Sequence, residues 1–169
     1  ETATLYQHCV RAIQRGAAVG AHGLPLIGSG DWNDGMDQVG ARGKGESVWL
    51  AFFRYDVLRR FAGLAHAQGE RAFAQSCLSE AAVLRGNIEL HGWDGEWYRR
   101  AYFDDGSPLG SMSNAECQID SVAQSWAVLS GAGDPVRSRT AMDSVNTRLV
   151  RRDDALIQLL DPPFDTSAL

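Results

Sequence analysis

The sequence predicts a mostly helical domain that carries one short β-hairpin. Apolar residues recur every three or four positions in five separate windows, which is the period of a helix with one buried face. Between the third and fourth windows the pattern changes to large side chains followed by turn residues, as in a hairpin. The residues with unusual chemistry lie in the connections, so we expect the function to lie in the loops.

The first two predicted helices cover residues 5–17 and 48–65. In the first, apolar residues recur at every fourth position, and the pattern weakens at Gly16. The second is longer, has a broad apolar face, and is closed by Gly69. Both windows are long enough for an amphipathic helix that packs one face against a neighbour.

Three further helices are predicted at residues 70–84, 119–129 and 135–149. The third window places its apolar residues on one face, and the fourth is stopped by glycines. The fifth has the clearest start, because Asp134 suits the capping position and Pro135 the first helical turn.

Two segments do not fit the helical period. Residues 97–111, WYRRAYFDDGSPLGS, are predicted to form the hairpin, and residues 153–160, DDALIQLL, are compatible with a strand or a helical turn. No internal repeat, low-complexity tract or linker divides the chain. Residues 1–169 are therefore expected to form a single segment of one domain.

Composition excludes several classes of protein. A net charge of −5 argues against nucleic acid as a partner, and no apolar run approaches the length of a membrane span. The cysteines are odd in number and far apart, and the histidines lack ligand spacing, so we expect reduced thiols and no metal site. We expect a location on the cytoplasmic side. Both ends read as internal to a longer chain, and no secretory leader is expected.

The loop at residues 28–40, GSGDWNDGMDQVG, combines carboxylates, an amide and a tryptophan between glycines. The Trp32 ring could stack on the apolar face of a sugar, while Asp31, Asn33 and Asp34 could hydrogen-bond its hydroxyls. A carboxylate beside an aromatic wall can also act as a general acid. The loop lacks the ligand spacing of an EF-hand, but a plain cluster of Asx turns remains open.

Four motifs together resemble a known family: GDWNDGMDQVG, GKGESVWLA, HGWDGEWYRRAYFDDGSPLGS and ECQIDSVAQSW. They are similar to glycoside hydrolase family 94, the cellobiose-phosphorylase-like enzymes formerly filed as glycosyltransferase family 36. The stretch LVRRDDALIQLLDPPFDTS also fits the C-terminal phosphorylase-like region of cyclic β-1,2-glucan synthases. The resemblance covers essentially the whole chain and implies that it is part of an (α/α)6 barrel.

The resemblance implies an inverting phosphorolysis of a β-linked glucan or glucoside, here phosphorolysis or chain-length trimming of a β-1,2-glucan. Inorganic phosphate is the co-substrate, and no cofactor is implied. Because phosphate is the nucleophile, a single protein carboxylic acid suffices. The motif assigns that role to Asp34 and places Trp32 against the sugar, with Asp31 and Asn33 shaping the loop. The parent could be an inner-membrane protein.

The resemblance also implies further substrate contacts: Arg100, Tyr102, Glu116 and Gln124. Glu116, Asp120 and Gln124 are four residues apart, so they would share one face if the fourth helix began at Glu116. Trp93 and Trp97 are open to two interpretations, as core aromatics under the hairpin or as sugar platforms.

The resemblance implies a phosphate site built from elements outside this chain, and a barrel of some twelve helices of which about five are expected here. We therefore expect a fragment of the catalytic domain, inactive in isolation, whose partner is the remainder of the parent polypeptide. We expect the side of the second helix that carries Phe52, Tyr55 and Phe61 to be exposed and to drive self-association. The alternative is a non-catalytic carbohydrate-binding or helical scaffold piece.

Overall fold

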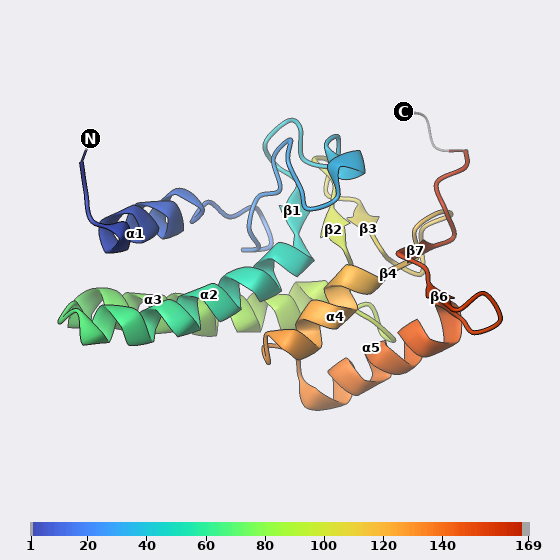
Figure 1. The fold of residues 1–169 in the computed structure, drawn as a ribbon. Helices are drawn as coiled ribbons and strands as arrows, with labels where there is room; N and C mark the ends of the chain where they lie inside the picture. The colour runs from blue at the N-terminus through green and yellow to red at the C-terminus, as the bar shows by residue number, and fades with distance from the viewer. Residues whose placement is uncertain (1, 167–169) are drawn as a thin grey trace.

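A computed structural model describes residues 2–166 and confirms a mostly helical chain (Figure 1). All five predicted helices are present, with ends that differ by a few residues from the predicted windows. Among the helices of residues 2–166, none combines the length and the apolarity that crossing a bilayer requires. The helices are α1 (Leu5–Arg15), α2 (Val48–Ala67), α3 (Arg71–Asn87), α4 (Ser121–Leu129) and α5 (Pro135–Arg148).

The strands are short and pair antiparallel. β1 (Glu46–Ser47), β2 (Ala101–Tyr102) and β3 (Pro108–Leu109) form one sheet in that order, and β2 with β3 confirms the predicted hairpin. The segment at 153–160 contributes to strands rather than to a helical turn. The other pairs are β4 (Ile119–Asp120) with β7 (Leu160–Asp161), and β5 (Val150–Arg151) with β6 (Leu156–Ile157).

Helix α1 lies beside the long α2 and α3 pair (Figure 1). Its start is fixed by a capping box, in which the Thr4 hydroxyl accepts from the Gln7 backbone N–H while the Gln7 side chain accepts from the Thr4 N–H. Tyr6 stacks on Phe61 of α2 with ring centroids 5.4 Å apart. The Arg54 guanidinium donates to two carbonyls at the end of α1, so this helix is held at both ends.

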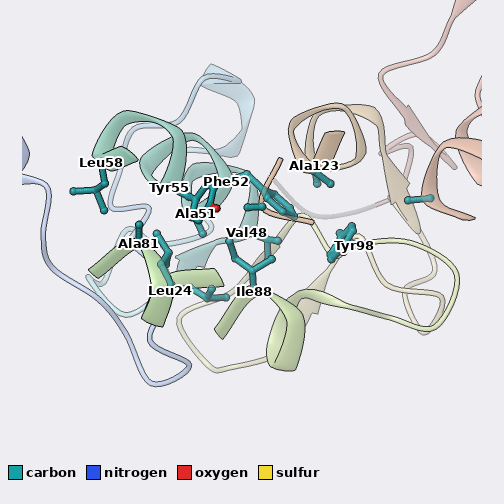
Figure 2. Packing of buried hydrophobic residues seen from close by; sticks show 14 of the residues in the cluster. Leu24, Val48, Ala51, Phe52, Tyr55, Leu58, Ala81, Ile88, Tyr98 and Ala123 are labelled. Atoms are coloured by element: carbon teal, nitrogen blue, oxygen red, sulfur yellow. The ribbon is translucent and has the colours of Figure 1, made fainter. Parts of the chain in front are cut away.

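The main core forms where α2 and α3 pack together and meet the segment after α3 (Figure 2). Phe52 meets Tyr98 edge to face at 5.1 Å, and Val48, Ile88 and Leu24 are fully buried around them. That segment is a π-helical turn, η2 (Ile88–Gly92), which continues from α3.

The expected exposure of the Phe52, Tyr55 and Phe61 side of α2 was wrong. These side chains are 0%, 5% and 8% exposed, because α3, Tyr98 and α1 cover them within this chain. The exposed apolar residues of α2 lie on its other side and include Phe53 and Leu64. Any association of this chain through α2 would therefore use that other side.

Helix α4 begins at Ser121 and not at Glu116. Residues 119–120 are extended because they pair with β7, and Asp120 caps the helix by accepting from the Val122 backbone N–H at 2.8 Å. Cys117 has a positive φ of 49°, which a helix would not allow. The four-residue spacing of Glu116, Asp120 and Gln124 therefore does not place them on one helical face.

Tyr98 gives a testable dependence of stability on pH. Burial, followed by its hydrogen bond to Glu89, raises the pKa of Tyr98 well above its ordinary value of 10.0. The folded state keeps this proton at a pH where the unfolded state has lost it, so the free energy of unfolding should fall as pH rises above 10. Denaturant unfolding of the wild type and of Tyr98→Phe should show a steeper alkaline loss in the wild type. Equal slopes would refute this.

Candidate active site

The loop at residues 28–40 presents a carboxylate and a tryptophan to solvent. It contains a short helical turn, η1 (Asp34–Met36), capped by Asn33, whose side-chain oxygen accepts from the Gly35 N–H at 3.1 Å. Met36 is buried in a second apolar cluster that also holds residues of β2 and β3. Asp34 is exposed, and Trp32 is 63% exposed. The Asx turn is therefore present, and it leaves the acid and the aromatic ring free to meet a ligand.

Asp31 is tied down just before these two exposed residues. Its carboxylate is 2% exposed, and Oδ2 forms an ion pair with the Arg100 guanidinium. The indole Nε1–H of Trp49, in the first turn of α2, donates to the other oxygen, Oδ1, at 2.7 Å. Both carboxylate oxygens are engaged, so the start of the loop has a fixed position relative to α2 and to the hairpin.

Arg100 is fully buried and lies among three segments. Besides Asp31, its Nε lies 3.4 Å from Oδ2 of Asp120, and its guanidinium sits 5.8 Å from the centre of the Trp49 ring. Burial raises the pKa of Asp120, and the positive charge of Arg100 opposes that rise. The interior thus holds one guanidinium against two carboxylates, between the loop, the hairpin and the start of α4.

The hairpin is shaped to hold Arg100. Gly110 has a positive φ of 78°, and a Cβ at this position would lie 2.5 Å from the Arg100 backbone nitrogen. Trp97 is fully buried and donates its indole N–H to the carbonyls of Gly110 and Gln118, at 3.0 and 2.9 Å. Trp93 packs edge to face on Tyr98 at 5.0 Å. Trp97 is therefore a core aromatic of the hairpin, and Trp93 is partly buried and packs against the core.

Tyr102 belongs to a second buried polar group. Its ring stacks on His22 at 4.0 Å, and its hydroxyl donates to the His91 carbonyl at 2.6 Å and accepts from Arg99 at 3.0 Å. Next to it, Glu46 is 2% exposed and pairs with Nδ1 of His22 at 2.5 Å. The pairing of His22 with Glu46 was not predicted, because 24 positions separate the two residues and neither belongs to a motif with a characteristic spacing.

Gln124 and Glu116 each bind backbone groups. The Gln124 amide is fully buried, accepts from the Tyr98 N–H at 2.8 Å and donates to the Tyr98 carbonyl at 2.7 Å. Glu116 is half-buried and accepts from the backbone N–H groups of Asp165 and Thr166 at 2.8 and 2.6 Å. Both side chains join segments distant in the sequence, and their role in contacting a sugar stays a prediction.

The structure does not bring all the predicted site residues together. Trp32 and Asp34 face solvent on one loop, whereas Arg100, Tyr102 and Gln124 lie in the interior and Glu116 is half-buried near residues 165–166. The structure joins the exposed loop to Arg100 through Asp31, the acid next to Trp32 in the sequence. Chemically, this is an exposed acid and an exposed aromatic ring on a loop that buried charges hold in place.

Comparison with known proteins places the chain in a family. The model of the Glycosyl hydrolase 94 superfamily catalytic domain matches residues 1–169, so the chain belongs to this family of carbohydrate-active enzymes. This confirms the resemblance seen in the motifs. The match covers every segment that builds the site, from the loop to the hairpin and the start of α4.

Three relatives show how far the likeness extends. The chain is 46% identical over 168 residues to the cyclic beta-(1,2)-glucan synthase NdvB of Rhizobium meliloti (strain 1021), covering 99% of this chain and 6% of that protein. It is 34% identical to solabiose phosphorylase of Paenibacillus borealis, covering 95% of this chain and 21% of that enzyme. It is 33% identical to the 3-O-beta-D-glucopyranosyl-beta-D-glucuronide phosphorylase of the same organism, covering 97% of this chain and 21% of that enzyme. The chain thus spans a minor part of each relative's length.

Proposed function

We propose that this chain is the acid-bearing segment of an inverting β-glucan phosphorylase-like domain, built as part of an (α/α)6 barrel, that acts on β-1,2-glucan. The observation that carries the proposal is the exposed pair of Trp32 and Asp34 on a loop whose preceding residue is locked in the interior. The likeness to a cyclic beta-(1,2)-glucan synthase supports the linkage, and the likeness to phosphorylases supports phosphate as co-substrate.

In the proposed reaction, the carboxylic acid of Asp34 protonates the glycosidic oxygen as the bond to the anomeric carbon breaks. A phosphate oxygen attacks that carbon from the opposite face and forms the new bond. The products are α-glucose 1-phosphate and a glucan shortened by one residue. Only one carboxyl group is required, because phosphate takes the place of the water that a second carboxylate would activate. Trp32 would hold the sugar ring against the acid.

The rest of the parent polypeptide would supply the phosphate site and the other barrel helices. The small share of each relative that the chain covers, 6% of the glucan synthase and 21% of the two phosphorylases, supports this part of the proposal. The parent enzyme is therefore the proper object of functional tests. By itself, the chain would hold an acid without an aligned nucleophile.

The proposal is tested by incubating the intact parent enzyme with phosphate and a panel of β-1,2-, β-1,3- and β-1,4-linked glucosides. The expected result is α-glucose 1-phosphate formed from the β-1,2-linked substrates in preference to the others. Binding of the glucan with no product would favour a carbohydrate-binding role instead. Release of glucose without consumption of phosphate would show hydrolysis and reject phosphorolysis.

Trp32→Ala should weaken glucan binding while leaving the fold unchanged. Because the ring is 63% exposed, its loss should change the free energy of unfolding by less than about 0.5 kcal/mol. Loss of sugar stacking should raise KM about 10-fold, equivalent to about 1.4 kcal/mol. Trp32→Phe keeps an aromatic face and should retain most of the affinity. A large fall in Tm with unchanged KM would instead assign Trp32 to the core.

A further inference from the structure

The buried ion pair between Asp31 and Arg100 lies at the base of the loop that carries Asp34. We propose that these two are positioning residues for the general acid, and that Trp49 completes the anchor through its indole N–H. The proposal rests on the proposed function of Asp34. It assigns to Asp31 and Arg100 no contact with substrate, but control over where the acid carboxyl stands.

The first argument is the distribution of anchors along the loop. Asp34 is exposed, so contacts of its own side chain do little to fix it. Asp31, three residues earlier, is held by Arg100 and Trp49, and Met36, two residues later, is buried in the second apolar cluster. The acid therefore sits on a short span between a polar anchor and an apolar one. Releasing either anchor would let the span move.

The second argument concerns the cost of burying these charges. Removing a guanidinium and two carboxylates from water is unfavourable, and a buried ion pair is by itself weak evidence for stability. Asp120 adds to this cost, because its Oδ2 and the facing Nε of Arg100 have no hydrogen-bond partner among residues 2–166. An apolar cluster could join the same segments more cheaply. The ion pair instead fixes the orientation of the Asp31 carboxylate, because Arg100 and Trp49 donate hydrogen bonds to separate oxygens of it.

The third argument is a contrast within the chain. Arg54 forms a comparable pair with Glu80, but that pair joins α2 to α3 and the end of α1, away from the loop. Its carboxylate is 40% exposed, whereas that of Asp31 is 2% exposed. A variant of the Glu80 pair disturbs a structural ion pair away from the loop, whereas a variant of the Asp31 pair disturbs one next to the acid. Glu80→Gln is therefore the control for Asp31→Asn.

The experiment measures kcat and KM of the intact parent enzyme with two substrates, a β-1,2-glucan and an aryl β-glucoside whose leaving group needs no proton. The variants are Asp31→Asn, Trp49→Phe, Glu80→Gln and, as a reference, Asp34→Asn. Trp49→Phe keeps a smaller aromatic ring at this partly buried position and removes the donor to Asp31, so it reports on positioning even if Asp31→Asn folds poorly. Thermal unfolding of each variant is measured in parallel.

A misplaced acid affects only the substrate that needs protonation. For Asp31→Asn, kcat on the glucan should fall about 10²-fold, the typical cost of a displacement near 1 Å, with KM close to wild type. Trp49→Phe should lose about 10-fold, as expected for one hydrogen bond to a charged group. Both should retain most of their activity on the aryl glucoside. Glu80→Gln should match the wild type on both substrates.

The outcomes distinguish the two proposals. If Asp34→Asn keeps its activity on the glucan, the proposed function itself fails. If Asp34→Asn loses activity but Asp31→Asn and Trp49→Phe do not, only the positioning role is overturned. Equal losses on both substrates for Asp31→Asn and Trp49→Phe would also overturn it, because a general disturbance of the fold does not depend on the leaving group.

Discussion

Asp34→Asn in the intact parent enzyme should lower kcat for β-1,2-glucan phosphorolysis by about 10²–10⁴-fold, the usual contribution of a general acid. Asparagine is nearly the same size as aspartate but has no carboxyl proton to give the departing sugar oxygen. The side chain is exposed, so the free energy of unfolding should stay close to that of the wild type. Rates of α-glucose 1-phosphate formation and denaturant unfolding measure the two effects separately.

A matched control for this variant is Asp37→Asn, which changes an exposed carboxylate of the same loop three residues later. Asp37 follows η1, and its carboxylate accepts a hydrogen bond from the side-chain amide of the neighbouring Gln38 at 3.1 Å. Its replacement should leave kcat unchanged. Near-normal phosphorolysis by Asp34→Asn, or an equal loss in both variants, would remove Asp34 from the role of proton donor.

Arg100→Met should destabilise the fold by about 3–5 kcal/mol, the cost of breaking a buried ion pair by removing one partner. Asp31 and Asp120 would then face each other in the interior without a cation. Burial already raises the pKa of Asp120 above its ordinary value of 3.8, so the folded protein keeps this proton at a pH where the unfolded chain has lost it. The free energy of unfolding therefore falls as pH rises above 3.8, and the variant should regain part of its stability in acid.

Arg60→Met is the control for this second prediction. Arg60 is 77% exposed, and it pairs with Asp56 four residues earlier on α2. Exposed pairs of this kind contribute little, so its unfolding curve should overlay that of the wild type. An Arg100→Met protein as stable as the wild type would mean that the buried carboxylates are satisfied without the guanidinium.

The helices could be predicted because the apolar residues of each recur at the helical period and pack at least partly against a neighbour. The start of α5 was confirmed at Asp134 and Pro135, where local chemistry alone decides the structure. The predicted start of α4 at residue 119 lies two residues before the observed start, because residues 119–120 pair with β7 instead. The same pairing rules out the earlier start at Glu116 that would have put Glu116 and Gln124 on one face. Strand pairing with a segment distant in the sequence does not change the local spacing of apolar residues, so that spacing cannot predict it.

The burial of α2 shows a second limit. Periodicity identifies an apolar face, but it does not say which neighbour covers it. Phe52 and Phe61 were expected to be exposed until helices from outside this chain covered them. Instead, Tyr98 and Tyr6 of this chain pack on them. The missing information is tertiary, since it depends on how α1 and the hairpin fold back onto α2.

The site was predictable where its residues are contiguous and unpredictable where they converge. The composition of the loop pointed to Trp32 and its polar neighbours, and the family resemblance singled out Asp34 among them. Nothing local shows that Arg100 meets Asp31, which lies 69 positions away. Opposite charges are common along the chain, and only folding selects which of them pair. The buried ion pair is therefore a finding of the structure.

The most direct test is the position of the Asp34 carboxyl in a structure of the intact parent enzyme with a β-1,2-glucan bound across the cleavage point. A carboxyl oxygen of Asp34 is expected about 2.6–3.2 Å from the glycosidic oxygen, within reach of proton transfer. The Trp32 ring should lie against the sugar, and the Asp31 to Arg100 pair should be intact. A different carboxyl group at that oxygen, with Asp34 directed into solvent, would contradict the assignment of the acid.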